Sequence, residues 1–262
     1  MINSLWSSSF SRNPQTFGQI CEKKLTLQNY NFETYGSIEK AMFFLETSGR
    51  SWLTPREACA LESAAASSNL KVNIIFLSDF VDLYDNSTCS IMKLLPNVSL
   101  FTIKLKNAFE DTPLYRFYQR DDFRNSSFKA VHMSDALRIA LIFKVGGFYS
   151  DLDTMTLGDL SRLENVIGST RMRGSGSHLA NGAFHLDRRH PLLWRVMRGM
   201  VEVYTGRERG EIGPLLLTRA VRQHFNVSDV KSVRREGLHV LPSTAFYPAK
   251  SEVYIYPINL SL

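Results

Sequence analysis

The sequence is poor in cysteine and in long apolar runs. Its 262 residues include three cysteines, Cys21, Cys59 and Cys89, and no pair has the C-x-x-C spacing. Such a sparse, odd set argues against a structural zinc site and a dense disulfide framework, and leaves open one disulfide beside one free thiol. No stretch approaches the roughly 18 apolar residues of a membrane-spanning helix. The first residues, MINSLWSSSFSRNPQTF, are too polar for a signal peptide.

The sequence also has only a small excess of charge of one sign. Lys and Arg number 31 and Asp and Glu number 25, giving a formal net charge of +6 that is concentrated in the C-terminal half. This balance excludes a polybasic tail, so we expect no nucleic-acid partner, and it is compatible with an anionic small ligand. With 44% hydrophobic and 21% charged residues, the composition is that of an ordinary globular domain.

Five Asn-x-Ser/Thr sequons are present, at Asn86, Asn97, Asn125, Asn226 and Asn259. This is the acceptor pattern for N-glycosylation. The excess over chance is modest. The five sequons favour a protein of the secretory-pathway lumen. Chance occurrence in a Ser-rich chain is the alternative.

Apolar runs alternate with helical patterns after residue 40. Residues 1–40 are polar and poorly periodic, and we expect an irregular lead-in there. Thr54, followed by Pro55 and Glu57, is typical of a capped helix start. Three buried strands are predicted, at residues 41–46, 72–77 and 98–103. Strands that alternate with helices indicate an α/β fold, with one mostly parallel, Rossmann-like sheet covered by helices on both faces.

The same alternation is strongest in the middle of the chain. Ser134 is predicted to cap a helix over residues 135–145, which Gly146-Gly147 ends. A short strand at 148–150 then leads to Asp151-Leu152-Asp153. Farther on, the pattern predicts a strand at 183–186 and helices that begin at Pro191 and Pro214. No internal repeat or linker divides the chain, so we expect one domain.

Asp151 and Asp153 form the most informative pair of residues. Two carboxylates just past a buried strand can both turn toward one point outside the carboxyl end of the sheet, where ligands of open α/β sheets bind. Such a pair suits a hard divalent cation, Mn or Mg, which would in turn hold a diphosphate. By itself, D-x-D is common in solvated surface loops that bind no ligand. The surrounding residues decide between such a loop and a metal site.

The surrounding residues carry a resemblance to a known family. Residues 134–157, SDALRIALIFKVGGFYSDLDTMTL, combine S-D-x-x-R, an apolar helix, Gly-Gly, an aromatic strand and D-x-D. This stretch resembles the signature of the α-1,4-glycosyltransferase family related to lactosylceramide 4-α-galactosyltransferase. The resemblance continues in order through FFLETSG at 43–49, ACALESAA at 58–65, NGAF at 181–184, GP-x-x-L-T-R at 213–219 and AFYP at 245–248.

The resemblance implies a GT-A-like catalytic domain over residues 41–250, followed by a short tail at 251–262. It also implies a metal-dependent, retaining transferase. Such an enzyme moves a hexose or N-acetylhexosamine from a UDP-sugar to a terminal galactose or hexosamine of a glycolipid, with an α-1,4 linkage.

Site residues follow from the same match. Asp151 and Asp153 correspond to the catalytic metal and diphosphate site, with Mn or Mg as cofactor. Asp135 and Arg138, three residues apart on one helix face, correspond to residues that hold the donor sugar. Weaker candidates for the rim of the donor or acceptor site are Asn181, Gly182, Gly213 and Pro214.

Each of these assignments has a structural alternative. Asp135 can serve as a first-turn carboxylate that favours the helix dipole, and Arg138 can form an ion pair with it. Gly182 can serve a tight turn, and Gly213-Pro214 can serve a helix start.

The resemblance also implies a location. Members of the family are type II membrane proteins, so we expect a membrane-associated protein of the Golgi lumen, held by a signal anchor that this chain lacks. They also continue past AFYP to an H-x-W-like segment, so we expect a chain that is short at both ends. A nucleotide-sugar- or glycan-binding pseudoenzyme is the alternative to an active transferase.

A haloacid-dehalogenase-like phosphatase is the rival enzyme class, because an apolar strand followed by D-x-D also begins that active site. That motif needs Thr or Val four residues after its first Asp, where this chain has Met155. It also needs a later acidic pair, and no adjacent acidic residues follow Asp153. These residues favour the transferase.

Overall fold

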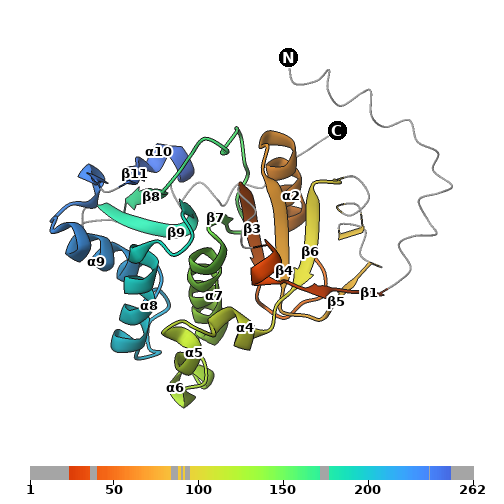
Figure 1. Cartoon of the computed structure of the whole chain (residues 1–262), viewed down its shortest axis with the longest axis horizontal. Coiled ribbons are helices and arrows are strands. Elements are labelled where there is room, and N and C mark those ends of the chain that lie inside the picture. Colours follow the sequence, from red (N-terminus) through yellow and green to blue (C-terminus); the bar gives the residue numbers. More distant parts are fainter. Residues whose placement is uncertain are drawn as a thin grey trace, which may run out of the picture.

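The computed structural model describes residues 24–35, 40–83, 88–89, 91, 95–171, 177–235 and 237–248 (Figure 1). The strands are β1 (Lys24–Thr26), β2 (Gln28–Asn29), β3 (Ala41–Glu46), β4 (Lys71–Phe76), β5 (Phe80–Asp82), β6 (Val98–Thr102), β7 (Gly147–Ser150), β8 (Val166–Arg171), β9 (Ser177–Leu186), β10 (Arg234–Arg235) and β11 (Leu238–Leu241). The helices are α1 (Phe32–Tyr35), α2 (Pro55–Ser67), α4 (Leu105–Phe109), α5 (Leu114–Phe117), α6 (Asp121–Arg124), α7 (Lys129–Val145), α8 (Pro191–Val203), α9 (Pro214–Phe225), α10 (Ser243–Phe246) and the 3-10 helix η2 (Val230–Ser232).

One nine-stranded sheet organises the chain, in the order β10-β11-β8-β9-β7-β3-β4-β6-β2. The neighbours from β2 to β7 are parallel, as are β8 and β11. Strand β9 runs antiparallel to both β7 and β8, and β10 runs antiparallel to β11. The predicted mostly parallel sheet is therefore confirmed. Strands β1 and β5 pair separately in a two-stranded sheet.

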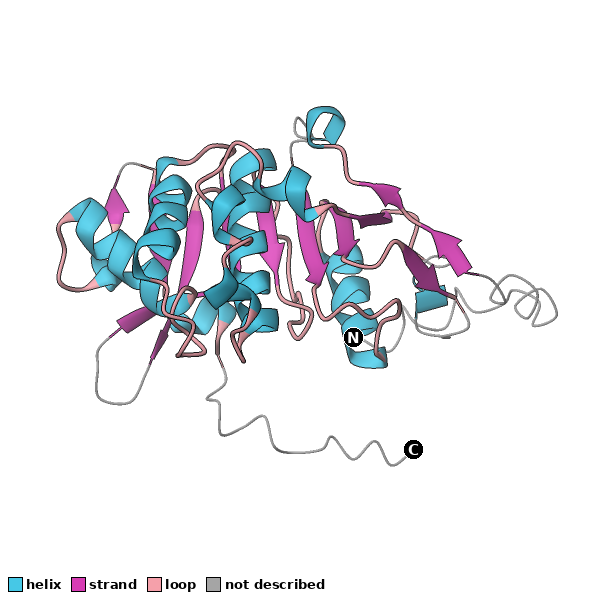
Figure 2. Cartoon of the chain, turned by 90° about the horizontal axis from the view of Figure 1, so that it is seen from below, coloured by secondary structure: helices cyan, strands magenta, loops and turns pink. Residues whose placement is uncertain are grey.

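Helices cover both faces of the large sheet, as predicted (Figures 1 and 2). Successive residues of a buried strand point to opposite faces, and Phe43 and Phe44 of β3 accordingly belong to two different apolar clusters. The larger cluster includes α7, α8 and α9, and the smaller includes α2, with Phe246 of α10 packed against it.

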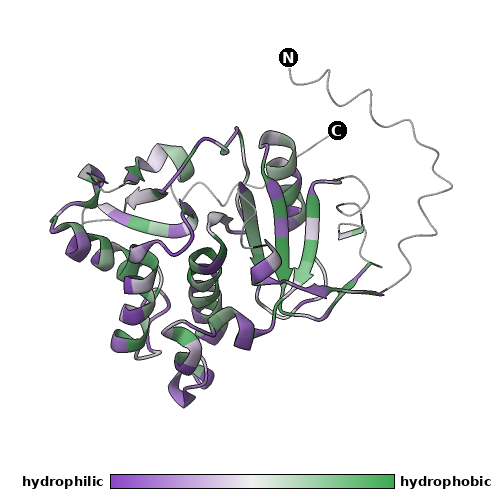
Figure 3. Cartoon of the chain, viewed as in Figure 1, coloured by the Kyte–Doolittle hydropathy of each residue, from purple (hydrophilic) through white to green (hydrophobic). Residues whose placement is uncertain are grey.

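Helix α7 is the central helix of the larger cluster, and Figure 3 shows it hydrophobic along most of its length. The prediction that Ser134 caps this helix is wrong, because the helix already begins at Lys129. The Ser134 hydroxyl instead accepts a hydrogen bond of 2.7 Å from Arg138 Nη2. Asp135 therefore lies outside the first turn, and an interaction with the helix dipole does not explain it.

Other predicted elements agree more closely. Strand β3 and the start of α2 lie where the sequence places them, and Thr54 and Glu57 form the predicted capping box. Strand β9 is longer than the predicted 183–186, since it pairs with both β7 and β8. Within the predicted irregular lead-in, the described residues form β1, β2 and α1. The tail at 251–262 lies outside the described residues.

Two cysteines are now placed. Cys89 is disulfide-bonded, and Cys59 is a free thiol on the surface. This confirms the combination of a disulfide with a free thiol that the sequence left open. In the described part of the chain, no helix is both long and apolar enough to cross a membrane.

Candidate functional site

A cavity of about 530 Å³ lies at the carboxyl ends of β3 and β7. The chain leaves β3 toward β4 on one side, whereas β7 lies on the other side of β3 and is preceded by α7. The sheet order therefore reverses between β3 and β7, which is where open α/β sheets bind ligands. The lining residues come from five segments: Thr47 and Ser48 after β3; Ala130, Val131, Ser134, Asp135 and Arg138 of α7; Asp151 after β7; Asn181 of β9; and Arg209, Gly210 and Pro214 before and at the start of α9.

Arg138 occupies the centre of this arrangement. Its Nη1 lies 2.9 Å from Asp151 Oδ1 and also donates to the carbonyl of Asn181 at 2.9 Å. Its Nη2 lies 3.7 Å from Asp135 Oδ1. The guanidinium also lies over the Tyr149 ring, 4.7 Å from its centroid. One buried cation thus joins α7, β7 and β9, and removing it would leave the buried Asp135 and the partly exposed Asp151 without their counter-charge.

Asp151 is held from several sides. The Tyr149 hydroxyl donates to Asp151 Oδ1 at 2.7 Å, because residues two apart on a strand share a face. The Asp151 backbone N–H donates to the carbonyl of Gly182 at 2.7 Å, which continues the pairing of β7 with β9. Gly182 lies against the carboxylate, since a Cβ there would lie 2.7 Å from Asp151 Oδ2. The backbone and two side chains therefore fix the orientation of Asp151.

Asp135 is held in a similar way. Asn181 Nδ2 donates to Asp135 Oδ1 at 2.7 Å. A Cβ on Gly213 would lie 2.6 Å from Asp135 Oδ2, so the backbone before α9 packs directly on this carboxylate. Pro214 occupies the first turn of α9 and lines the cavity. Asp135, Arg138, Asn181, Gly182, Gly213 and Pro214 are thus brought together around Asp151, although they are far apart in sequence.

The site shifts the pKa values of its ionisable groups. Removal from water raises the pKa of both Asp135 and Asp151, although Arg138 partly offsets this. Burial opposes the charge of Arg138, but the acidic groups around it outweigh this effect and raise its pKa. Burial also raises the pKa of Tyr149 well above its ordinary value, so the phenol stays protonated as a donor to Asp151. A cation near these carboxylates would favour their ionised forms.

Asp153 differs from the other predicted residues. It is exposed and does not line the cavity, yet its charge is close enough to raise the pKa of Asp151. The described residues contain no cluster of three or more His, Cys, Asp or Glu side chains that could hold a metal. Mg²⁺ and similar ions are commonly bound by one or two carboxylates plus substrate phosphates. Asp151 and Asp153 therefore fit a hard divalent cation that shares its coordination with a bound diphosphate.

Several neighbours of Asp151 were not singled out by the sequence as site residues. Tyr149 could have been found from its spacing of two from Asp151. Tyr247 lies in the AFYP segment, and its hydroxyl would be 3.1 Å from a Cβ on Gly182, next to Asp151 Oδ2. Burial raises the pKa of this hydroxyl. Only the fold shows that Tyr247 and Asp151 both lie against Gly182.

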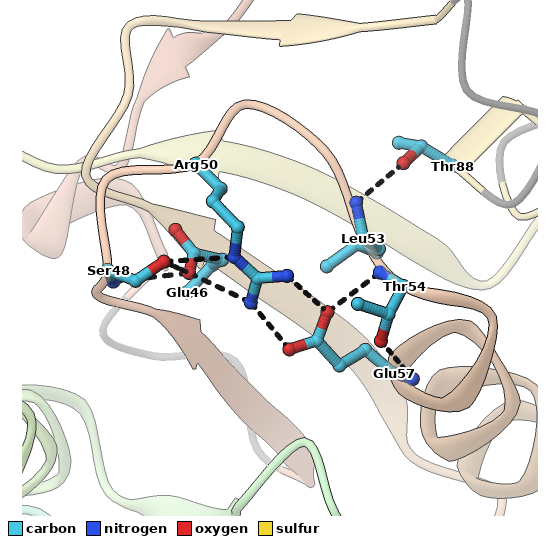
Figure 4. Close-up of polar contacts among 7 residues, drawn as sticks. All are labelled: Glu46, Ser48, Arg50, Leu53, Thr54, Glu57 and Thr88. Atoms are coloured by element: carbon cyan, nitrogen blue, oxygen red, sulfur yellow. Dashed lines mark hydrogen bonds and ion pairs between the residues drawn. The ribbon is translucent and has the colours of Figure 1, made fainter.

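A second polar cluster lies at the end of β3, beside the cavity (Figure 4). Arg50 bridges two carboxylates, with Nη2 lying 3.3 Å from Glu46 Oε1 and 2.6 Å from Glu57 Oε1. Glu46 also accepts a hydrogen bond from the Ser48 backbone N–H at 3.1 Å. Because Glu57 caps α2, this cluster fixes the turn that carries Thr47 and Ser48 into the cavity wall.

Comparisons with known proteins agree with this geometry. The family model described as "Glycosyltransferase sugar-binding region containing DXD motif" matches residues 54–172, and "Alpha 1,4-glycosyltransferase conserved region" matches residues 185–254. Lactosylceramide 4-alpha-galactosyltransferase of Pongo pygmaeus is 37% identical over 155 residues, which cover 58% of this chain and 69% of that protein. This chain belongs to the α-1,4-glycosyltransferase family.

Two human members of the family match at greater length. Human lactosylceramide 4-alpha-galactosyltransferase is 33% identical over 221 residues, covering 82% of this chain and 61% of that protein. Human alpha-1,4-N-acetylglucosaminyltransferase is 32% identical over 222 residues, covering 81% of this chain and 64% of that protein. The chain thus spans about three-fifths of the length of these relatives.

A solved structure supports the fold. The chain is similar to "PaToxG Glycosyltransferase", with a TM-score of 0.54 and 15% identity, over 81% of this chain and 77% of that one. The α/β domain is therefore GT-A-like, as the resemblance implied.

Proposed function

We propose that this chain is the catalytic part of a UDP-sugar-dependent α-1,4-glycosyltransferase. It would transfer a hexose or N-acetylhexosamine, with retention of configuration, to a terminal galactose or hexosamine of a glycolipid. The observation that supports this most strongly is that buried Arg138 lies between the carboxylates of Asp135 and Asp151 in the cavity at the β3–β7 switch point. The names of the family relatives supply the galactosyl and N-acetylglucosaminyl alternatives for the transferred sugar.

The chain's own residues suit this reaction. Asp135 is held through Oδ1 by Asn181, and no described residue hydrogen-bonds its Oδ2, which can accept from a hydroxyl of the donor sugar. Tyr149 and Arg138 hold Asp151 toward the diphosphate, and Asp153 adds a second carboxylate. Mn or Mg bound by Asp151 and Asp153 would neutralise the charge that grows on the diphosphate leaving group.

The proposed setting follows from the acceptor. A glycolipid substrate lies in a membrane, and the predicted sequons favour a lumenal protein. We therefore place the enzyme at the membrane, in the Golgi lumen.

The test of the proposal is Asp153→Asn. We expect loss of sugar transfer from UDP-galactose, UDP-N-acetylgalactosamine or UDP-N-acetylglucosamine to lactosylceramide-type and arthro-series acceptors, because the carboxylate pair is broken. Asp159→Asn is the matched control, since Asp159 is an exposed carboxylate farther along the same loop that accepts hydrogen bonds from Ser161. Transfer is measured with MnCl₂ and with EDTA.

The other outcomes are decisive too. Unchanged turnover of Asp153→Asn would contradict the assignment of the site. UDP binding by the wild-type chain with no transfer to any acceptor would instead identify a nucleotide-sugar-binding pseudoenzyme.

A further inference from the structure

The cavity has a second arginine that the site does not use. Arg138 is committed to Asp151, Asn181 and Ser134. Arg209 lines the same cavity and is exposed, and no described residue forms an ion pair or hydrogen bond with its guanidinium. The cavity therefore holds one neutralised cation and one that is available to a ligand.

The segment that carries Arg209 is held in place. This segment, residues 205–213, joins α8 to α9 and is called the 205–213 loop here. The Glu211 carboxylate accepts hydrogen bonds from the backbone N–H groups of Thr205 and, at 3.0 Å, of Gly206. The Ser126 hydroxyl donates to the Gly206 carbonyl at 2.8 Å. The start of the loop is thereby fixed before the chain reaches Arg209.

Helix α7 fixes the remainder of the loop. His132 is buried; its Nε2 donates to the carbonyl of Glu208 at 3.0 Å, and its Nδ1 forms a hydrogen bond of 3.0 Å with the Tyr204 hydroxyl. Gly213 at the other end packs against Asp135. Arg209 thus follows directly after a carbonyl bonded to α7, the same helix that supplies Asp135 and Arg138, and its backbone is positioned relative to them.

We propose that Arg209 binds the diphosphate of the nucleotide donor. This inference rests on the proposed function. A diphosphate carries the anionic oxygens for which a planar guanidinium is suited, through paired, charge-assisted hydrogen bonds. The carboxylates in the cavity would repel this anion, and Arg209 supplies a positive charge that no described carboxylate neutralises.

The test is binding of UDP and uridine to the full chain, measured by titration calorimetry with Mn²⁺ and with EDTA. We expect Arg209→Gln to weaken UDP binding by roughly 10- to 100-fold, the value of one or two hydrogen bonds to a charged group. Uridine binding should not change, because uridine has no phosphate. Arg209→Lys should keep part of the UDP affinity, since the charge is retained.

Arg207→Gln is the matched control. Arg207 is an exposed arginine of the same loop that does not line the cavity. Arg207→Gln should leave the UDP affinity at the wild-type value. Circular dichroism should show the same thermal unfolding for Arg207→Gln and Arg209→Gln as for the wild type.

Three results would overturn the inference. If wild type and Arg209→Gln bind UDP equally, the assignment of Arg209 is wrong while the proposed function stands. If UDP affinity is unchanged but transfer to sulfated acceptors is lost selectively, Arg209 binds an acidic acceptor instead. If the wild-type chain binds neither UDP nor a UDP-sugar, the proposed function fails, and this inference fails with it.

Discussion

At the scale of single residues, the site depends on two glycines as well as on its charged groups. Gly182 and Gly213 lie where a side chain would displace the carboxylates of Asp151 and Asp135. Neither has a positive φ. At both positions the backbone approaches a carboxylate more closely than a Cβ permits.

Gly213→Ala tests this close approach. The new Cβ would lie 2.6 Å from Asp135 Oδ2 and 3.0 Å from Cγ, so Asp135 must move and its hydrogen bond with Asn181 must lengthen. We expect a loss of about 1–3 kcal/mol in the free energy of unfolding, as for overpacking of a filled core. Donor affinity should fall as well. Urea unfolding and UDP-sugar titration measure the two effects.

Gly158→Ala is the control for that substitution, because nothing lies within 4 Å of a Cβ at Gly158. It should change neither quantity. If Gly213→Ala matched Gly158→Ala in both measurements, the contact between Gly213 and Asp135 would have no energetic importance.

At the scale of elements, the start of α2 links helix stability to the cavity wall. Thr54 Oγ1 accepts from the Glu57 N–H at 3.3 Å, and Glu57 Oε2 accepts from the Thr54 N–H at 2.8 Å. Glu57 also pairs with Arg50, which contacts Glu46 at the end of β3 (Figure 4). The capping box thus joins the helix to the turn that borders the cavity.

Thr54→Ala removes one half of that capping box. We expect the free energy of unfolding to fall by about 1 kcal/mol, the usual value of a lost N-cap. Arg56→Ala, an exposed change in the first turn of the same helix, is the control. Both are measured by urea denaturation, and an equal effect of the two would show that the cap contributes nothing specific.

Elements were predictable where the signal was local. The buried run of β3 and the Thr54–Glu57 capping box depend on residues next to one another, and both agree with the structure. The start of α7 was not predictable from Ser134. A serine before an apolar helical pattern can cap the helix, or it can lie inside the helix and bind Arg138, and the local sequence does not distinguish the two. Strand β9 was underestimated, since the pairing of its first residues with β8 is a long-range property.

At the scale of the whole molecule, two histidines couple stability to pH. Burial lowers the pKa of His185, although Asp187 and Glu164 oppose this, and its Nδ1 accepts a hydrogen bond from the Asn165 N–H at 3.0 Å. Burial likewise lowers the pKa of His190, whose Nδ1 accepts from the Leu192 N–H at 3.2 Å. Both contacts require a neutral ring nitrogen.

The direction of the pH effect follows from these shifts. A histidine with a lowered pKa in the folded state binds protons more readily when unfolded, so stability is present above about pH 6.5 and is lost as the pH falls below it. We expect the thermal unfolding midpoint to decrease when the pH is lowered from 7.5 to 5.5. The decrease should be smaller in His185→Gln. The exposed His239→Gln is the control and should follow the wild type. A steeper fall in His185→Gln would contradict this explanation.

The sequence by itself determined the local features of this protein: the buried strands, the cap of α2, the D-x-D pair after β7 and the family signature around it. Each depends on the type and spacing of neighbouring residues. Only the tertiary structure decided which groups meet in the cavity. Asn181 reaches Asp135 across 46 positions, Arg138 reaches the Asn181 carbonyl across 43, and Tyr247 lies beside Asp151. These contacts depend on the register of β9 against β7 and on the packing of α7, which periodicity along the chain does not specify.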